Sequence, residues 1–163
     1  MQTVHTAEGV QEIVERIEKL TPTTKPLWGK MNAAQMLWHL QGPLEVPLGR
    51  HELPKSFMMK VIGPMIRKKL LADGPISKNS PTASTLKVTS EKDFNKEKQA
   101  LIATLKEYSA AAQAGKLPPA HPYWGKLSKD DWDKMQWKHL DSHALQSSLS
   151  CVQSTLHPSP SRH

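Results

Sequence analysis

The sequence predicts an all-α protein, a four-helix bundle with a long crossover between its second and third helices. Three observations favour this class. Apolar residues recur at helical spacing in four long segments, and almost no other regular pattern is found. Good capping residues precede these segments. The long connection between the second and third segments is typical of crossover bundles, which build metal sites from side chains on facing helices.

Composition sets the limits within which this fold is expected. The chain has 163 residues, of which 37% are hydrophobic and 23% charged, and this is enough for one domain with a real core. We expect the helical domain to span 6–149. The serine- and proline-rich stretch 150–163 has no periodicity and is expected to form a disordered tail.

The distribution of charge and the single cysteine limit the kinds of partner and the cellular location that we expect. The net charge is +7, but lysines and acidic residues are interleaved, and the only dense basic cluster is 67–69. No nucleic-acid partner is therefore expected. No apolar run approaches the roughly 20 residues that span a bilayer, and no secretory signal is present, so no membrane partner is expected either. The lone Cys151 cannot form an internal disulfide, which favours a cytoplasmic location.

The first half of the bundle is predicted from two amphipathic segments. The first helix spans 6–20 and ends at a proline-containing turn, 21–26. The second begins at Asn32 and runs to about Leu48, with a kink expected at Pro43. One face of the first helix carries the apolar residues Val10, Ile13, Val14, Ile17 and Leu20.

The crossover is predicted as two short helical pieces within 54–71, broken at Gly63-Pro64, followed by a loop and a brief extended segment at 86–88. An apolar set in the crossover has two interpretations. It could face a membrane or a partner, or it could pack against the bundle, and we favour packing. The set is Phe57, Met58, Val61, Ile62 and Met65.

The second half of the bundle is predicted to hold two more helices. The third spans about 90–114, with Ser90 as its cap and Gly115 as its stop. The fourth begins at Ser128, with Asp131 as the reciprocal capping partner, and fades near Leu149.

A short phrase occurs twice and leads into two of these helices. Its copies, 26–31 and 122–127, share Pro, Trp, Gly and Lys, and they end just before the caps Asn32 and Ser128. Counting from those caps, His39 falls at position 7, His139 at 11 and His143 at 15. These offsets are close to whole numbers of turns, so the three imidazoles leave their helices at nearly the same angle.

This phase predicts a metal site of three histidines, His39, His139 and His143. The pair spaced i,i+4 suits a metal on one helix, although such pairs also arise by chance, and a lone histidine like His39 is more often a core residue. The other histidines are assigned no chemistry. Trp38, Trp132 and Trp137 are expected in the core, whereas Trp28 and Trp124 are expected to anchor the two loops. The histidines left aside are His5, His51, His121, His157 and His163.

The residues that carry this pattern resemble the DinB/YfiT-like superfamily, and more narrowly one of its uncharacterised branches. The resemblance rests on 32–39, on His139-Leu140-Asp141-Ser142-His143 and on Gln146, and it covers about residues 8–146. It implies a four-helix bundle in which the three matching histidines bind a divalent metal such as zinc or nickel. Characterised relatives include transferases and isomerases that use low-molecular-weight thiols such as bacillithiol, mycothiol or glutathione.

Two departures from that family are visible. Ser142 stands where the branch often has a further histidine, which leaves the three ligands intact. After Gln146 the family usually closes with an aromatic-glycine ending, and here the serine-rich tail follows instead.

Two functions remain open at this point. The first is a metal-dependent enzyme acting on a small-molecule substrate, a thiol-dependent transferase, with the basic segment 67–69 attracting an anionic thiol. The second is a non-catalytic metal-binding or stress-response protein whose site is structural. Gln35 and Gln146 are candidates to orient ligands or substrate, and Glu45 is a weak candidate for a catalytic carboxylate. A homodimer is left open.

Overall fold

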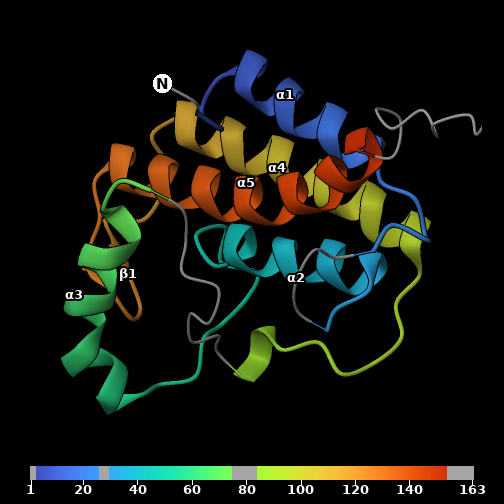
Figure 1. Ribbon diagram of the computed structural model, residues 1–163. Helices are drawn as coiled ribbons and strands as arrows, with labels where there is room; N and C mark the ends of the chain where they lie inside the picture. Colours follow the sequence, from blue (N-terminus) through green and yellow to red (C-terminus); the bar gives the residue numbers. More distant parts are fainter. Residues whose placement is uncertain (1–2, 26–29, 75–83, 154–163) are drawn as a thin grey trace, which may run out of the picture.

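The structure, a computed structural model, describes residues 3–25, 30–74 and 84–153, and the side chains among these up to residue 143. Figure 1 shows a mostly helical molecule. The described part of the chain contains five α-helices, one short 3₁₀ helix and a two-stranded antiparallel sheet. The prediction of an all-α protein is therefore confirmed. No helix in this part is long and apolar enough to cross a bilayer.

The helices and strands follow one another in a simple order. The α-helices are α1 (Ala7–Glu18), α2 (Ala33–Glu45), α3 (Phe57–Leu71), α4 (Phe94–Gln113) and α5 (Lys129–Gln153), the 3₁₀ helix is η1 (Ser84–Leu86), and the strands are β1 (Ala120–His121) and β2 (Gly125–Lys126).

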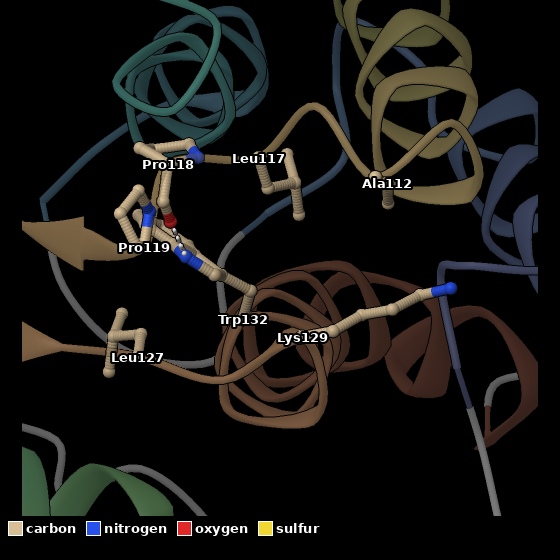
Figure 2. A pocket seen from close by; sticks show the side chains of 8 residues that line it. Ala112, Leu117, Pro118, Pro119, Leu127, Lys129 and Trp132 are labelled. Carbon is tan, nitrogen blue, oxygen red and sulfur yellow. Dashed lines mark hydrogen bonds between the residues drawn. The ribbon is translucent and has the colours of Figure 1, made fainter.

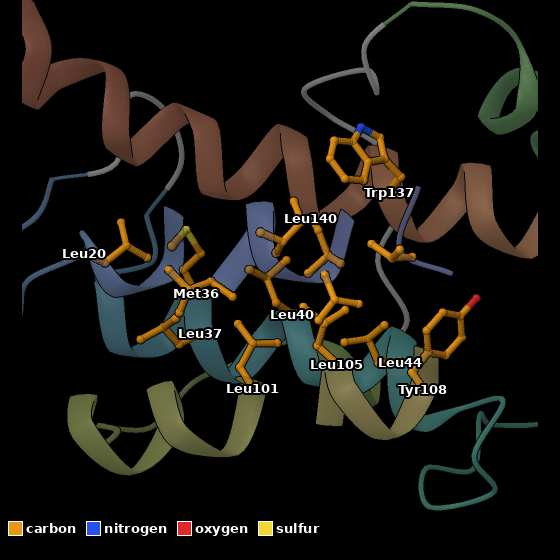
Figure 3. Close-up of a cluster of buried hydrophobic side chains, with 14 residues drawn as sticks. Leu20, Met36, Leu37, Leu40, Leu44, Leu101, Leu105, Tyr108, Trp137 and Leu140 are labelled. Carbon is orange, nitrogen blue, oxygen red and sulfur yellow. The ribbon is translucent and has the colours of Figure 1, made fainter. Parts of the chain in front are cut away.

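Four helices enclose the main core. Helix α2 packs along α4, α1 packs against α4 and α5, and α2 also contacts α5. Side chains from all four meet in one apolar cluster (Figure 3). Helix α3 lies outside this group, and it contacts α5 and β2. The core is built largely from Val10, Ile13, Ile17, Leu37, Leu40, Leu44, Leu101, Leu105, Tyr108, Trp137 and Leu140.

Local capping explains where most of these helices begin. Asn32 and Gln35 form a reciprocal capping box at α2, and Ser128 and Asp131 exchange the same bonds at α5. Both predicted starts are confirmed. The predicted cap of α4 is wrong, because Asp93 rather than Ser90 accepts the backbone N–H of Lys96, at 2.7 Å. An ionised carboxylate is the stronger acceptor for a free helix donor.

The ends of the last two helices differ in how well the sequence anticipates them. Gly115, with φ +68°, stops α4 as predicted. Helix α5 continues beyond Leu149 to Gln153. The rest of the predicted tail, 154–163, lies outside the described residues, as do residues 26–29 of the first copy of the repeated phrase.

The crossover corrects two predictions about its backbone. Gly63-Pro64 does not break the helix, because α3 runs without interruption through both residues. Pro64 removes one hydrogen bond, to the carbonyl of Lys60, and the exposed position of Lys60 lets water replace it. No extended segment forms at 86–88, since Leu86 ends η1 and the next residues are irregular.

The preferred packing of the crossover side chains is also wrong. Four of the five apolar residues singled out there are exposed rather than packed against the bundle. Helix α3 turns its opposite side inward, where Gly63 lies directly against the backbone of the hairpin. The exposed residues are Phe57, Met58, Val61 and Met65.

Candidate metal centre

The three histidines predicted from helix phase lie together between α2 and α5. His39 comes from the middle of α2, and His139 and His143 stand one turn apart on α5. One ring nitrogen from each lies within 4.8 Å of the others. The ring centroids are 5.3 Å apart for His39 with either partner and 4.9 Å apart for His139 with His143. This group could hold a metal ion.

The spacing fits the demands of a small divalent ion. Three nitrogens bound tetrahedrally to zinc at about 2.1 Å are about 3.4 Å apart. The nitrogens here come from two helices and lie within 4.8 Å of one another, so a bound zinc ion would draw them closer together by up to about 1.4 Å. The rings meet edge to face, with interplanar angles of 70–84°.

His39 is oriented by a backbone carbonyl that the sequence did not predict as a partner. Its Nδ1 lies 3.0 Å from the carbonyl oxygen of Leu86 in η1. This pairing makes Nδ1 the N–H donor and leaves Nε2 as the free ligand atom. The side chain of Leu86 packs in the space left by Gly42, because a Cβ there would lie 2.2 Å from Cδ2 of Leu86 and would push that side chain aside. A glycine inside a strongly apolar helix was the available signal for this contact.

His139 carries a buried nitrogen with no protein partner. Its Nδ1 is inaccessible to solvent and makes no hydrogen bond among the described residues. A buried polar atom left this way costs about 1–3 kcal/mol. Protein interiors rarely keep such an atom unless something outside the chain satisfies it.

Electrostatics keep all three imidazoles neutral at physiological pH. Burial, and to a smaller extent the neighbouring His39, lower the pKa of His143 to about 4. Burial also lowers the pKa of His39, against the opposing effect of the Leu86 carbonyl. The pKa of His139 lies well below its ordinary value, mainly through burial and then through the charges of His143 and His39. Neutral imidazole is the form that binds metal.

Other residues predicted around the site have different tasks. The Gln35 side chain accepts the Asn32 N–H at 3.0 Å and donates to the Ser90 carbonyl at 3.3 Å, so it secures the start of α2. Glu45 is not part of the histidine group. Arg67 forms an ion pair with Asp131 at 3.1 Å. The side chain of Gln146 lies outside the described residues.

The tryptophans largely follow expectation. Trp132 and Trp137 are buried as predicted. Trp38 is only half-buried, and Lys92 Nζ lies 4.6 Å from its ring centroid, so the core prediction is wrong for this residue. Trp124 packs against a second apolar cluster, formed by Leu127, Trp132 and Met135, and its ring stacks on that of His121 with centroids 3.8 Å apart, consistent with an anchor for the hairpin. Trp28 lies outside the described residues.

Sequence reasoning missed two buried histidines. His5 Nε2 lies 3.1 Å from the Tyr108 hydroxyl and 3.9 Å from Oδ1 of Asp133. The same Asp133 accepts the Val4 N–H at 2.8 Å and the Thr3 hydroxyl. The available signal was an acidic residue on the inner face of α5. His121 is buried too, and its Nδ1 accepts the Tyr123 N–H at 3.1 Å.

An apolar pocket of about 200 Å³ lies near the end of α4 and the start of α5 (Figure 2). Trp132 donates from Nε1 to the Pro118 carbonyl at 2.9 Å along its wall. None of the three clustered histidines lines this pocket. Its walls are formed by Ala112, Gly115, Leu117, Pro118, Pro119, Leu127, Lys129 and Trp132.

Comparisons with known proteins complete this description. Searches of curated proteins and of solved structures found no match to this chain. One family model matches residues 4–148, a range that contains all three clustered histidines. The chain therefore belongs to the family described as "Protein of unknown function (DUF1569)".

Proposed function

We propose that this protein binds one divalent metal ion through His39, His139 and His143, with zinc and nickel as the best candidates. The observation that carries the proposal is the buried Nδ1 of His139, which has no partner among the described residues and lies in a group of three neutral imidazoles. Imidazole nitrogen suits both metals. The carbonyl of Leu86 supplies the outer contact that ligand histidines usually make.

The finer proposal is a thiol-dependent transferase. A metal with three neutral nitrogen ligands and a vacant fourth position supplies an activated thiolate or hydroxide near neutral pH. The resemblance to the DinB/YfiT-like superfamily favours the thiol. The basic segment 67–69 gives this idea less support than expected, because Arg67 is already paired with Asp131.

A catalytic site and a structural site differ in the fourth ligand. Among the described side chains the group contains three histidines and no fourth cysteine, histidine or carboxylate. In the rest of the chain the sequence offers three residues of ligand type, Cys151, His157 and His163. A variant that combines Cys151→Ser, His157→Ala and His163→Ala therefore removes the cysteine and histidine side chains of this part that could serve as a fourth protein ligand.

The metal proposal is tested by measuring bound metal. Purified wild type, reloaded with zinc or nickel and desalted, should carry about one equivalent by elemental analysis, as one three-nitrogen site requires. The double variant His139→Ala, His143→Ala should carry almost none. His51→Ala is the matched control, because His51 bonds Thr85 outside the group, and it should retain the metal. A wild type that holds no metal after reloading would exclude the proposal.

The fourth position is tested separately with cobalt(II) as the probe. If the position is open, the triple variant of Cys151, His157 and His163 keeps its cobalt, and added glutathione, bacillithiol or mycothiol changes the absorption spectrum of wild type and variant alike. Transfer of the thiol to an electrophile would then support the transferase. Metal binding without any thiol response would reject the transferase and leave the metal site standing.

A further inference from the structure

Helix α3 exposes a stripe of large apolar side chains. Phe57 is 83% exposed, Met58 66%, Val61 63% and Met65 61%. Residues four apart stand above one another on a helix, so Phe57, Val61 and Met65 share one face, with Met58 beside them. We call these four side chains the α3 stripe. Isolated exposed apolar residues are ordinary, but a contiguous set marks a surface that is covered by something.

The opposite side of α3 is fixed to the rest of the molecule. A Cβ built on Gly63 would lie 1.8 Å from the carbonyl oxygen of Tyr123, so helix and hairpin are in backbone contact. Lys138 Nζ donates to the carbonyls of Leu70 and Ala72, at 2.8 and 2.7 Å, and secures the end of the helix. Helix α3 is therefore fixed to the hairpin and to α5 on one side and exposes the stripe on the other. It lies at the edge of the molecule in Figure 1.

The charged residues of the segment that carries the stripe are all basic. Between Glu52 and Asp73 the sequence contains no acidic residue. Among the described residues, no ion pair engages the four exposed lysines of this segment. Their aliphatic stems can lie along an apolar surface while the ammonium groups reach outward. These lysines are Lys55, Lys60, Lys68 and Lys69.

We propose that the α3 stripe docks on an anionic lipid surface, with α3 lying in the plane of the interface. Apolar side chains flanked by lysines are what such a surface accepts, since the chains enter the acyl boundary and the ammonium groups meet anionic headgroups. A second copy is a poorer occupant, because a twofold contact would set this basic surface against itself. A groove on another protein also accepts a projecting apolar helix face, and the vesicle experiment below distinguishes that occupant from a lipid surface.

The test uses the full chain and vesicles of two compositions, phosphatidylcholine alone and equal parts of phosphatidylcholine and phosphatidylserine. Wild type should co-sediment with the mixed vesicles about tenfold more strongly than with the neutral ones, and high salt should weaken this binding. The double variant Phe57→Ser, Val61→Ser should lose about tenfold in affinity. Its thermal unfolding should be unchanged because both side chains are exposed.

A charge variant and its control complete the experiment. Lys60→Glu with Lys68→Glu should abolish the preference for phosphatidylserine, whereas Lys106→Glu, an exposed lysine on α4, should not. Failure of wild type to sediment with mixed vesicles would overturn the proposal. A soluble oligomer or complex that Phe57→Ser, Val61→Ser dissociates, without vesicle binding, would overturn it as well and identify the stripe as a protein contact. None of these outcomes depends on the metal site.

Discussion

Two histidine clusters lie against α5, and they differ in whether their polar atoms have partners among the described residues. At one, His5 has the Tyr108 hydroxyl at 3.1 Å and the Asp133 carboxylate at 3.9 Å. At the other, three histidines meet without a carboxylate, and Nδ1 of His139 has no partner among the described residues. Both groups join segments that are distant in the sequence, but only the first has all its partners among the residues that the structure describes.

The difference separates a structural role from a ligand role. Asp133 accepts a backbone N–H and a hydroxyl from the N-terminal segment, so that cluster fastens residues 3–5 to α5. A complete network gives rigidity and has no need of a further atom. In the three-histidine group, Nδ1 of His139 has no partner within the described part of the chain, and the group could hold a metal ion. Burial alone does not distinguish the two, since it lowers the pKa of histidines in both.

The largest effect should follow from breaking the complete cluster. Asp133→Asn replaces an acceptor-only carboxylate by an amide that must turn an NH₂ toward a donor. We expect the free energy of unfolding to fall by about 3 kcal/mol, because a buried charged acceptor is lost. Denaturant unfolding measures this. The affinity for metal should stay within about twofold, since the two clusters share no residue.

The neighbouring Asp130→Asn serves as the control for this change. Asp130 is exposed, and its replacement should alter stability by no more than about 0.5 kcal/mol. If Asp133→Asn and Asp130→Asn had equal effects, Asp133 would not fasten the N-terminal segment. A large loss of metal affinity in Asp133→Asn would show that the two clusters are coupled.

A third buried histidine offers an intermediate case. His121 accepts one backbone N–H, and burial lowers its pKa to about 4. The unfolded chain, with a histidine pKa near 6.5, takes up the proton first, so stability is complete above about pH 6.5 and falls as the pH drops toward 4. Between pH 7 and 5 this histidine should account for a loss of about 2 kcal/mol.

His121→Asn, compared with wild type in the presence of a chelator, isolates that contribution. The other buried histidines also titrate, so the quantity to measure is the difference between the two pH dependences. The variant should lose about 2 kcal/mol less than wild type between pH 7 and 5. Equal slopes would mean that the pKa of His121 is the same in the folded and the unfolded chain, so that its burial does not affect the pH dependence of stability.

Features that depend on neighbouring residues in the sequence, such as helix caps and helical periodicity, could be predicted from the sequence. Asn32 and Ser128 cap their helices as expected, and the helical period from those caps brings His39, His139 and His143 to one place. The angular position of a residue around a helix depends only on its distance from the cap. An error of a few residues in where the helix ends therefore does not change it. The same reasoning placed the first cap of α4 three residues too early, because Ser90 and Asp93 are both good caps by type.

What the sequence did not reveal depends on contacts between distant segments. The Leu86 carbonyl and the His39 ring that it contacts are 47 positions apart in the sequence, and no periodicity connects them. Gly42 leaves room for the side chain of Leu86 beside α2. His5 meets Asp133 from the opposite end of the chain. The exposure of Phe57 and Val61 was missed for a similar reason, since Gly63 decides which side of α3 turns inward.

The smallest expected change in the free energy of unfolding distinguishes the two clusters best. Replacing a histidine by leucine should stabilise the protein at one cluster and destabilise it at the other. In the chelated protein, His139→Leu removes the buried Nδ1 that lacks a partner, and we expect unfolding to cost about 1 kcal/mol more. His5→Leu deprives the buried Tyr108 hydroxyl of its partner, and should cost about 1–2 kcal/mol of stability. Adding zinc should stabilise wild type and His5→Leu but not His139→Leu. If His139→Leu were instead destabilising without metal, its imidazole would already be satisfied, and the observation on which the metal proposal rests would be lost.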